Sequence, residues 1–149
     1  MAKVTISNQR NVLKKLQKDA DKKTANALFK SRDELIKAIK SEISRGKSPV
    51  VNERWKPYSE DYANRYKGGS KTPVNMKQTG DMLDSLEMRK IRNKIDIFFG
   101  SFIAVFHDQL GAGKNKVIRR LLPDPSKGER FNTRLTRIIN KIIKRGLGS

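Results

Sequence analysis

The sequence predicts an α+β fold with a long N-terminal helix, a small antiparallel β-sheet built on a central hairpin, and a C-terminal amphipathic helix. Apolar residues recur at three- and four-residue steps near both ends of the chain, as in amphipathic helices. In the middle, apolar and polar residues alternate on both sides of a tight turn, which predicts a hairpin. The 149 residues fit one domain. Within this single domain over 1–149, the expected parts are a long helix 8–45, an irregular connection 46–78, a hairpin-centred core 79–122 and a basic helical segment 123–149.

The first part, 8–45, is predicted to be one long helix. Ser7 and Asn8 are candidate caps for its start, and Gly46 supplies a stop at its end. The polar run 21–24 is the position at which this helix would kink or split. Unbroken, the helix would be roughly 55 Å long at about 1.5 Å per residue, so we expect part of it to project and meet a neighbouring molecule. The apolar positions are Val12, Leu13, Leu16, Ala20, Ala27, Leu28, Leu35, Ile36, Ile39 and Ile43.

The connection 46–78 contains several prolines and a glycine pair, and within it 58–67 is predicted to form a short helix that Ser59 caps. Trp55 and two nearby tyrosines are expected to anchor the connection on the core. Basic and aromatic residues also alternate here, a pattern that could stack single-stranded bases. Three acidic residues among them work against a groove for a polyanion.

The central part, 79–122, is expected to hold the sheet. Thr79 and Gly80 mark the start of one or two helical turns. A hairpin follows, with alternating strands on either side of a tight turn at 92–94 and one buried face.

The end of this central part is dense in apolar residues. Four of the six phenylalanines fall within 98–106, so the aromatic core is expected there. The segment 117–122 is a candidate third strand.

The chain is strongly basic, with a formal net charge of +19, and such a field attracts nucleic acid, an anionic membrane or an acidic protein. The C-terminal helix is expected to bury Leu135, Ile138, Ile139 and Ile142 on one face and to carry a basic stripe on another. The region 114–145 holds 11 basic residues against two acidic ones, which makes it the strongest candidate polyanion surface. The candidate residues for DNA or an acidic partner are Lys114, Lys116, Arg119, Arg120, Arg134, Arg137, Lys141 and Lys144.

No arrangement of residues predicts catalysis, so we expect no enzyme activity, no cofactor and no metal. The run 111–115 has the composition of a phosphate-binding loop, but Asp108 and Asn115 stand where that pattern needs glycine and Ser or Thr. His107 is the single histidine and lacks a partner at metal-ligand spacing, so we interpret it as structural. No hydrolytic triad emerges.

The chain contains no cysteine, which excludes disulfides and thiolate metal sites. No stretch approaches the roughly 20 apolar residues of a membrane helix, and the first residues lack the apolar run of a secretory signal. We therefore expect a soluble protein that is made in the cytoplasm and has no membrane partner.

Three segments carry motifs in a definite order: WKPYS at 55–59, TGDMLDSL at 79–86 and AVFHDQLG at 104–111. This order resembles the tail-completion or virion-morphogenesis proteins of tailed bacteriophages, whose pattern is W-x-P-L/Y-S, a basic stretch, T-G-x-L-x-x-S, a β-hairpin and Y-A-x-x-H-Q-x-G. The sequence departs from the pattern at Ile103, where the family has tyrosine, and has one extra residue before His107. The family's next segment has only a partial counterpart here.

The resemblance implies a structural virion protein that completes the tail or joins it to the head, in the neck or tail of a particle assembled in the host cytoplasm. It implies a ring of identical subunits that contacts connector or adaptor proteins, tail-tube or terminator proteins and, as a further candidate, packaged DNA. It brings no catalytic residues. The competing interpretation is a nucleic-acid-binding protein without sequence preference. Candidate interface or core residues are Leu13, Leu16, Leu28, Leu35, Ile39, Trp55, Leu83, Phe106 and His107.

Overall fold

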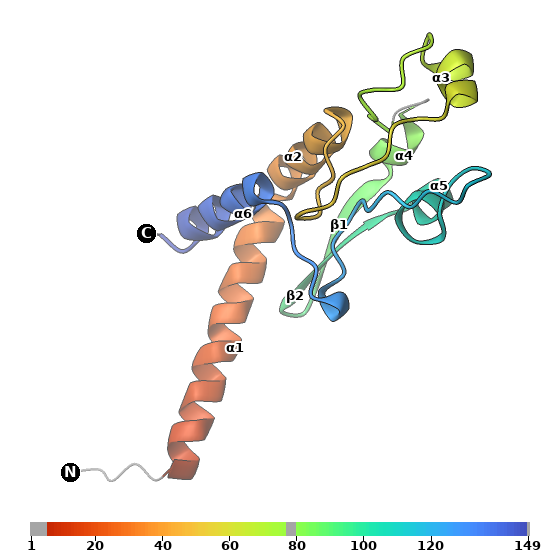
Figure 1. The fold of residues 1–149 in the computed structure, drawn as a ribbon. Coiled ribbons are helices and arrows are strands. Elements are labelled where there is room, and N and C mark those ends of the chain that lie inside the picture. Colours follow the sequence, from red (N-terminus) through yellow and green to blue (C-terminus); the bar gives the residue numbers. More distant parts are fainter. Residues whose placement is uncertain (1–5, 77–79, 149) are drawn as a thin grey trace.

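Figure 1 shows the computed structural model of the chain, which describes residues 6–76 and 80–148. The fold is α+β, as predicted, with helices at both ends and an antiparallel hairpin between them. Side chains are described for Lys15 and from Gln17 onward, so the predicted interface residues Leu13 and Leu16 lie outside the described side chains. The elements are α1 (Ile6–Lys30), α2 (Arg32–Ser44), α3 (Glu60–Tyr66), α4 (Asp81–Asp84), β1 (Leu86–Ile91), β2 (Lys94–Phe99), α5 (Phe102–Val105), the π-helix η1 (Phe106–Leu110), the 3-10 helix η2 (Pro125–Lys127) and α6 (Thr133–Gly146).

The helix expected over 8–45 is two helices, and the break lies at Ser31 rather than at 21–24. Figure 1 shows the first part of α1 extending away from the body, and the side chains over 17–23 are exposed there. Polar residues at 21–24 therefore fit an uninterrupted helix surrounded by solvent. The bend at Ser31 instead redirects the chain, so that Leu35 and Ile39 of α2 are buried in the core.

The predicted stop at Gly46 is confirmed. Gly46 adopts φ +78°, and its N–H donates to the carbonyl of Ile43 while the N–H of Lys47 donates to the carbonyl of Glu42. This pair of bonds is the Schellman motif, which satisfies carbonyls that a helix end leaves open. A Cβ at Gly46 would lie 2.9 Å from the Cβ of Pro73, so both the backbone angle and the space favour glycine.

The predicted hairpin is confirmed, with a turn of two residues instead of three. Lys94 already pairs with Ile91, which leaves Arg92 and Asn93 as the loop, and Arg92 adopts φ +56°. On one face of the pair, Leu86 lies opposite Phe99 and Met88 opposite Ile97. Leu86 and Met88 are buried, while Ile95, Ile97 and Phe99 are partly buried against the core.

The third strand expected over 117–122 is wrong for the described residues. Val117 forms only an isolated bridge with Ala112. Beyond it, the N–H of Arg119 donates to the carbonyl of His107, and those of Leu121 and Leu122 donate to Oδ1 of Asp108. Because a turn of helix and a side chain take these donors, no strand ladder forms.

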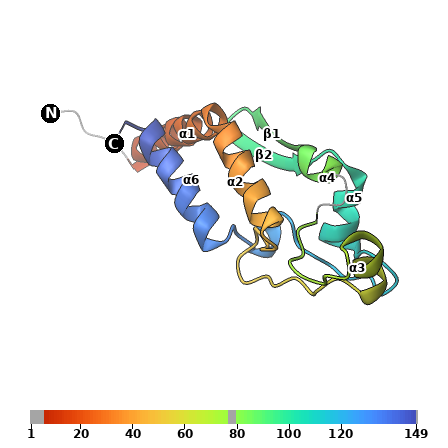
Figure 2. The ribbon, with the colours of Figure 1, turned by 90° about the horizontal axis from the view of Figure 1, so that it is seen from above.

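The C-terminal helix α6 is confirmed and packs beside α1 and α2 (Figure 2). Asn132 caps it, with Oδ1 accepting from the N–H of Leu135 at 2.9 Å. Leu135 and Ile142 are buried, and Gly146 lies so close to Ala27 of α1 that a Cβ has no room there. The lack of a side chain at Gly146 therefore lets the two helices approach closely.

The fully buried side chains are mainly aliphatic, and the expected aromatic core within 98–106 is wrong except at Phe99, which packs against the core. The largest fully buried side chains come from α2, α6, the segment before η2 and Pro49 in the connection after α2, whereas Phe102 is 68% exposed and Phe106 42% exposed. Among the predicted core residues, Leu35, Ile39 and Leu83 are buried and Leu28 and Trp55 are partly buried.

Candidate functional site

Two adjacent arginines on the extended segment 117–122 line different cavities. Arg120 lines a cavity of ≈ 530 Å³ that β2, α5, η1 and η2 surround. Arg119 lines an open cleft of ≈ 900 Å³ between the start of α3 and the loop 111–117, with His107 also in its lining. We call this second space the Arg119 cleft. The two side chains have different partners, and that difference determines what each cavity can do.

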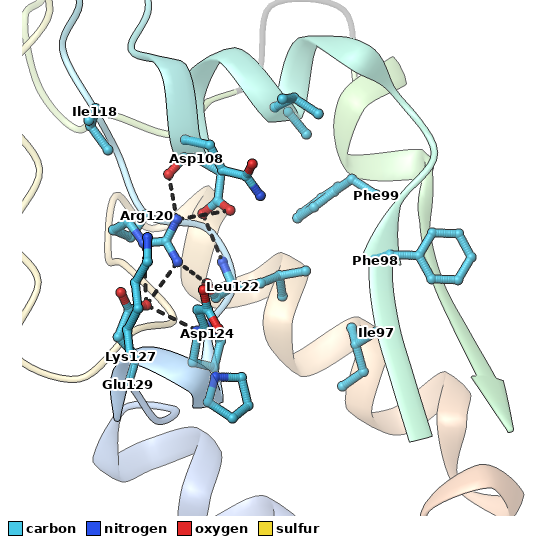
Figure 3. Close-up of a pocket in the computed structure, with 15 residues that line it drawn as sticks. Ile97, Phe98, Phe99, Asp108, Ile118, Arg120, Leu122, Asp124, Lys127 and Glu129 are labelled. Carbon is cyan, nitrogen blue, oxygen red and sulfur yellow. Dashed lines mark hydrogen bonds and ion pairs between the residues drawn. The ribbon is translucent and has the colours of Figure 1, made fainter. Parts of the chain in front are cut away.

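Arg120 is neutralised by two carboxylates (Figure 3). Nη1 lies 3.1 Å from Oδ2 of Asp108, and Nη2 lies 2.9 Å from Oε2 of Glu129. Further bonds run to the carbonyls of Asp108 and Leu122. Oε2 of Glu129 also accepts from the N–H of Asp124. This network joins η1 to the segment before α6, and Figure 3 shows Phe99 pointing toward the same space while Phe98 points away.

The network shifts the pKa of its members in the directions expected for a paired cluster. Burial lowers the pKa of Arg120, but the hydrogen bond with Glu129 and the charge of Asp108 outweigh it and leave that pKa raised. The hydrogen bond from Arg120 holds the pKa of Glu129 below its usual value. The positive charge of Arg120 is therefore fully compensated, and the three side chains together carry −1, so the cluster offers no positive charge to an anionic ligand.

Arg119 is 6% exposed and has only neutral partners among the described residues. Nε and Nη2 donate to the carbonyl of Lys56 at 3.2 and 3.0 Å, and Nη2 donates to the carbonyl of Pro57 at 3.2 Å. The guanidinium lies 5.5 Å from the ring centroid of Tyr58. Burial lowers its pKa. No described carboxylate pairs with this buried cation, and no described residue accepts from Nη1.

His107 lies beside this arginine and has a buried Nδ1 without a hydrogen-bond partner in the described part of the chain. Burial, with the positive charge of Arg119, lowers its pKa to about 4. The imidazole is therefore neutral at neutral pH. In that form each ring nitrogen is either a donor or an acceptor of a hydrogen bond, and the hydrogen-bonding capacity of the buried Nδ1 is unused among the described residues.

The rest of the Arg119 cleft combines cations with aromatic rings. Lys56, Lys114 and Lys116 line it as exposed cations, against one acidic side chain, Asp61. The rings of Tyr58 and Tyr62 lie 4.7 Å apart at one wall, and Tyr66 continues the row at 5.1 Å from Tyr62. The structure thus brings the aromatic stretch of 55–66 next to the basic loop 111–117.

The helix formed by α5 and η1 carries an exposed apolar surface. Phe102 and Phe106 contact each other edge to face, with ring centroids 5.1 Å apart. The four residues Phe102, Ile103, Phe106 and Leu110 are 68%, 56%, 42% and 55% exposed. We call them the α5–η1 patch. Clusters of exposed, large apolar side chains are typical of interaction surfaces.

The eight predicted basic residues do not form one surface. Arg119 and Arg120 are internal, and Arg134 pairs with the buried Glu42 at 2.6 Å. Figures 1 and 2 place α6 and the loop 111–117 at opposite ends of the body. Arg137, Lys141 and Lys144 lie exposed on α6, and Lys114 and Lys116 lie exposed on the loop. The single stripe is therefore divided into two separate groups.

Residues of the first two motifs, 55–59 and 79–86, act locally as framework. Nε1 of Trp55 donates to the carbonyl of Arg120 at 3.1 Å, and Ser59 caps α3 as predicted. Gly80 begins α4 with φ +91°, while Thr79 lies outside the described residues. Oγ of Ser85 accepts from the N–H of Ser101, which ties the two ends of the hairpin together.

Sequence reasoning missed the acidic partners that organise the basic residues. Glu42, Asp108 and Glu129 each bind an arginine, yet nothing in their local pattern distinguishes them from surface carboxylates. Among the described residues, no group of three or more His, Asp or Glu side chains is placed to hold a metal ion. Within the same part of the chain, no helix has the length and apolarity needed to cross a membrane.

Comparison with protein families, with curated proteins and with solved structures finds no match for this chain.

Proposed function

We propose that the protein is a structural subunit of a tailed-bacteriophage virion, a tail-completion or neck protein that forms a ring at the head–tail junction or in the upper tail. The observation that carries this proposal is the α5–η1 patch. A helix that presents two phenylalanines, an isoleucine and a leucine to solvent is suited to a protein contact. The patch also overlaps the motif at 104–111 that resembles the phage family.

The projecting part of α1 supports an assembled state. Its described side chains over 17–23 are exposed, and Figure 1 shows this part of the helix extending away from the body. Most helical stability in proteins comes from burial of an apolar face, so the projecting part of α1 would gain stability from a partner that covers it. The sequence places Val12, Leu13 and Leu16 along this part at helical spacing. A contact between unlike surfaces of adjacent subunits closes into a ring if the rotation permits.

The first test is the molar mass of the full chain in solution, measured by light scattering after size exclusion. We expect a multiple of 17.0 kDa that persists in high salt, because an apolar contact is not screened. The double variant Phe102→Asp/Phe106→Asp should reduce the mass to that of a monomer. Ile91→Asp is the matched control, since Ile91 is 52% exposed at the tip of the hairpin. A patch variant that keeps the wild-type mass would contradict the proposed contact.

The second test addresses the virion role itself. If the gene is deleted from its parent phage genome, electron microscopy should show filled heads beside separate or malformed tails. Normal infectious particles would sink the virion proposal.

The exposed cations of α6 support the competing function, a nucleic-acid-binding protein without sequence preference. Salt separates the two proposals. A dedicated binder loses DNA affinity steeply with salt, whereas a ring subunit keeps its oligomeric mass at a salt concentration that abolishes DNA binding. A chain that is monomeric at all salt concentrations but binds DNA would favour the competing function.

A further inference from the structure

The Arg119 cleft has a buried positive charge at its base and no acidic partner for it in the described structure. A buried charge that lacks a counter-charge is costly, and hydrogen bonds to neutral carbonyls compensate it only in part. Arg119 places Nε and Nη2 on two backbone carbonyls and leaves Nη1 without a described acceptor. Because Arg119 also lines the cleft, an anion that enters could accept a charge-assisted hydrogen bond from Nη1.

The rim of the cleft adds exposed cations to this buried one. Lys56, Lys114 and Lys116 are exposed and line the same space, so with Arg119 the cleft holds four basic side chains against Asp61. Its volume of ≈ 900 Å³ is within the range of small-molecule sites. An anion is therefore favoured over a neutral or cationic ligand.

The walls favour an anion with an aromatic ring. Tyr58 and Tyr62 both line the cleft, and Tyr62 is only partly buried. A carboxylate-rich peptide would neutralise the cations but would make no use of the tyrosine rings that line the cleft. A nucleotide joins an anionic phosphate to a base whose aromatic ring can pack on tyrosine, so it uses both the cations and the tyrosine rings of the cleft.

We propose that the Arg119 cleft binds a nucleotide unit of a single-stranded nucleic acid. A phosphate lies between Nη1 of Arg119 and the ammonium groups of Lys114 and Lys116, and the base packs on the ring of Tyr62. A single strand is required because bases in a duplex are stacked on one another and cannot reach the wall. This site is independent of the ring contact and of the α5–η1 patch, so it stands or falls separately from the virion role.

The main experiment measures binding of the full chain to a short fluorescein-labelled oligothymidine by fluorescence anisotropy. The cleft variant is Lys114→Gln/Lys116→Gln, and the matched control is Arg137→Gln/Lys141→Gln on α6, which removes the same charge at the other end of the body. We expect the cleft variant to lose about tenfold or more in affinity and about 1.4 from the slope of log K against log salt, because two phosphate contacts are removed. The control should lose about twofold or less. Equal losses in both variants would overturn the site, because they would show binding by net charge alone.

The tyrosine wall is tested by a pair of substitutions that differ only in the ring. Tyr62→Phe should keep the affinity for oligothymidine, and Tyr62→Leu should lower it about tenfold, since base stacking on one aromatic residue contributes that order of affinity. Circular dichroism and thermal unfolding confirm that each variant is folded. If Tyr62→Leu binds as tightly as the wild type, the base is not stacked there and the proposal fails.

Competitors identify the ligand class. Unlabelled duplex DNA at equal phosphate concentration should displace oligothymidine more weakly than unlabelled single strand does. If a phosphate of the nucleic acid lies beside Arg119, inorganic phosphate should displace oligothymidine more strongly than chloride does at matched ionic strength. Displacement by polyglutamate as strong as by the single strand would overturn the nucleotide assignment in favour of an acidic peptide, and so would duplex that competes equally well.

Discussion

Arg120 meets two carboxylates across a cavity of ≈ 530 Å³, whereas Arg119, one residue earlier, ends among carbonyl oxygens and tyrosine rings. Both residues are basic, largely inaccessible and part of the same extended segment. They differ in the partners that other parts of the chain place beside each guanidinium group. Glu129 and Asp108 supply the counter-charges of Arg120. Arg119 has no carboxylate partner among the described residues, so its cleft is suited to an external anion. Charge at a cleft is thus informative only after its internal counter-charges have been subtracted.

The largest expected effect on stability comes from removing the ion pairs of Arg120. Arg120→Met removes the cation and leaves Asp108 and Glu129 facing each other without compensation. Breaking a buried ion pair by removing one partner costs about 3–5 kcal/mol. We expect a loss of this order in the free energy of unfolding, measured by urea denaturation with circular dichroism. A loss below about 1 kcal/mol would show that the network contributes little to stability.

The corresponding change on the other side should cost less. Arg119→Met removes a buried charge without leaving a carboxylate unpaired. The methionine side chain fills much of the space that the arginine side chain occupied. We expect the free energy of unfolding to fall by less than about 2 kcal/mol, mainly from the lost bonds to the carbonyls of Lys56 and Pro57. Urea denaturation in parallel with Arg120→Met measures the difference directly. If the two variants are equally unstable, the distinction between the sites is wrong. A folded Arg119→Met variant should also lose oligothymidine binding.

Acid should destabilise the two sides over different pH ranges. The pKa of His107 is about 4 in the folded chain and about 6.5 when unfolded, so the unfolded state takes up a proton first as the pH falls. The stability due to neutral His107 is fully present above about pH 6.5 and is lost between there and pH 4. We expect this loss to be on the order of 1–3 kcal/mol after allowance for solvent near the ring. Between pH 6.5 and pH 4, the free energy of unfolding of His107→Gln should therefore depend less on pH than that of the wild type.

On the other side, the depressed pKa of Glu129 gives stability that is present above its ordinary value and is lost only at lower pH. Glu129→Gln should therefore leave the change between pH 6.5 and pH 4.5 intact while weakening the pH dependence below that range. Melting temperatures of the two variants over a pH series separate these contributions. If Glu129→Gln also reduces the pH dependence between pH 6.5 and pH 4.5, His107 and Glu129 do not titrate independently.

The smallest effect is expected on α6. Arg137 and Lys141 are exposed and have no described ion-pair partner, so Arg137→Glu/Lys141→Glu should change the free energy of unfolding by about 0.5 kcal/mol or less. The same substitutions should still reduce any weak binding of long duplex DNA. A large loss of stability here would mean that this face is covered in the folded protein.

Local patterns in the sequence predicted local structure well. The steps that predicted the apolar face of α6, the cap at Ser59 and the stop at Gly46 all depend on residues within a few positions, so one sequence reveals them. The hairpin was predicted for the same reason, with only the length of its turn in error.

The remainder depended on contacts that are distant in sequence. The acceptors for Arg119 lie on Lys56 and Pro57, so no local pattern marks this arginine as internal. The third strand failed because the carbonyl of His107 and the carboxylate of Asp108 took its donors. A run of phenylalanines gave no sign of which face meets the core, and Phe102 and Phe106 proved to be on the surface.

The close approach of Gly146 to Ala27 has a consequence for the order of folding. Arg145 also reaches Glu34 at 2.6 Å, across 111 positions in the sequence. During synthesis α1 is made early and can first contact α2 and the hairpin, but its contact with α6 forms only after the end of the chain has been translated and released. Non-local contacts of this kind slow folding, and an unpacked helix exposes apolar surface while the chain grows. Docking of the last turn of α6 therefore completes the packing of α1, which until then rests only on α2 and the hairpin.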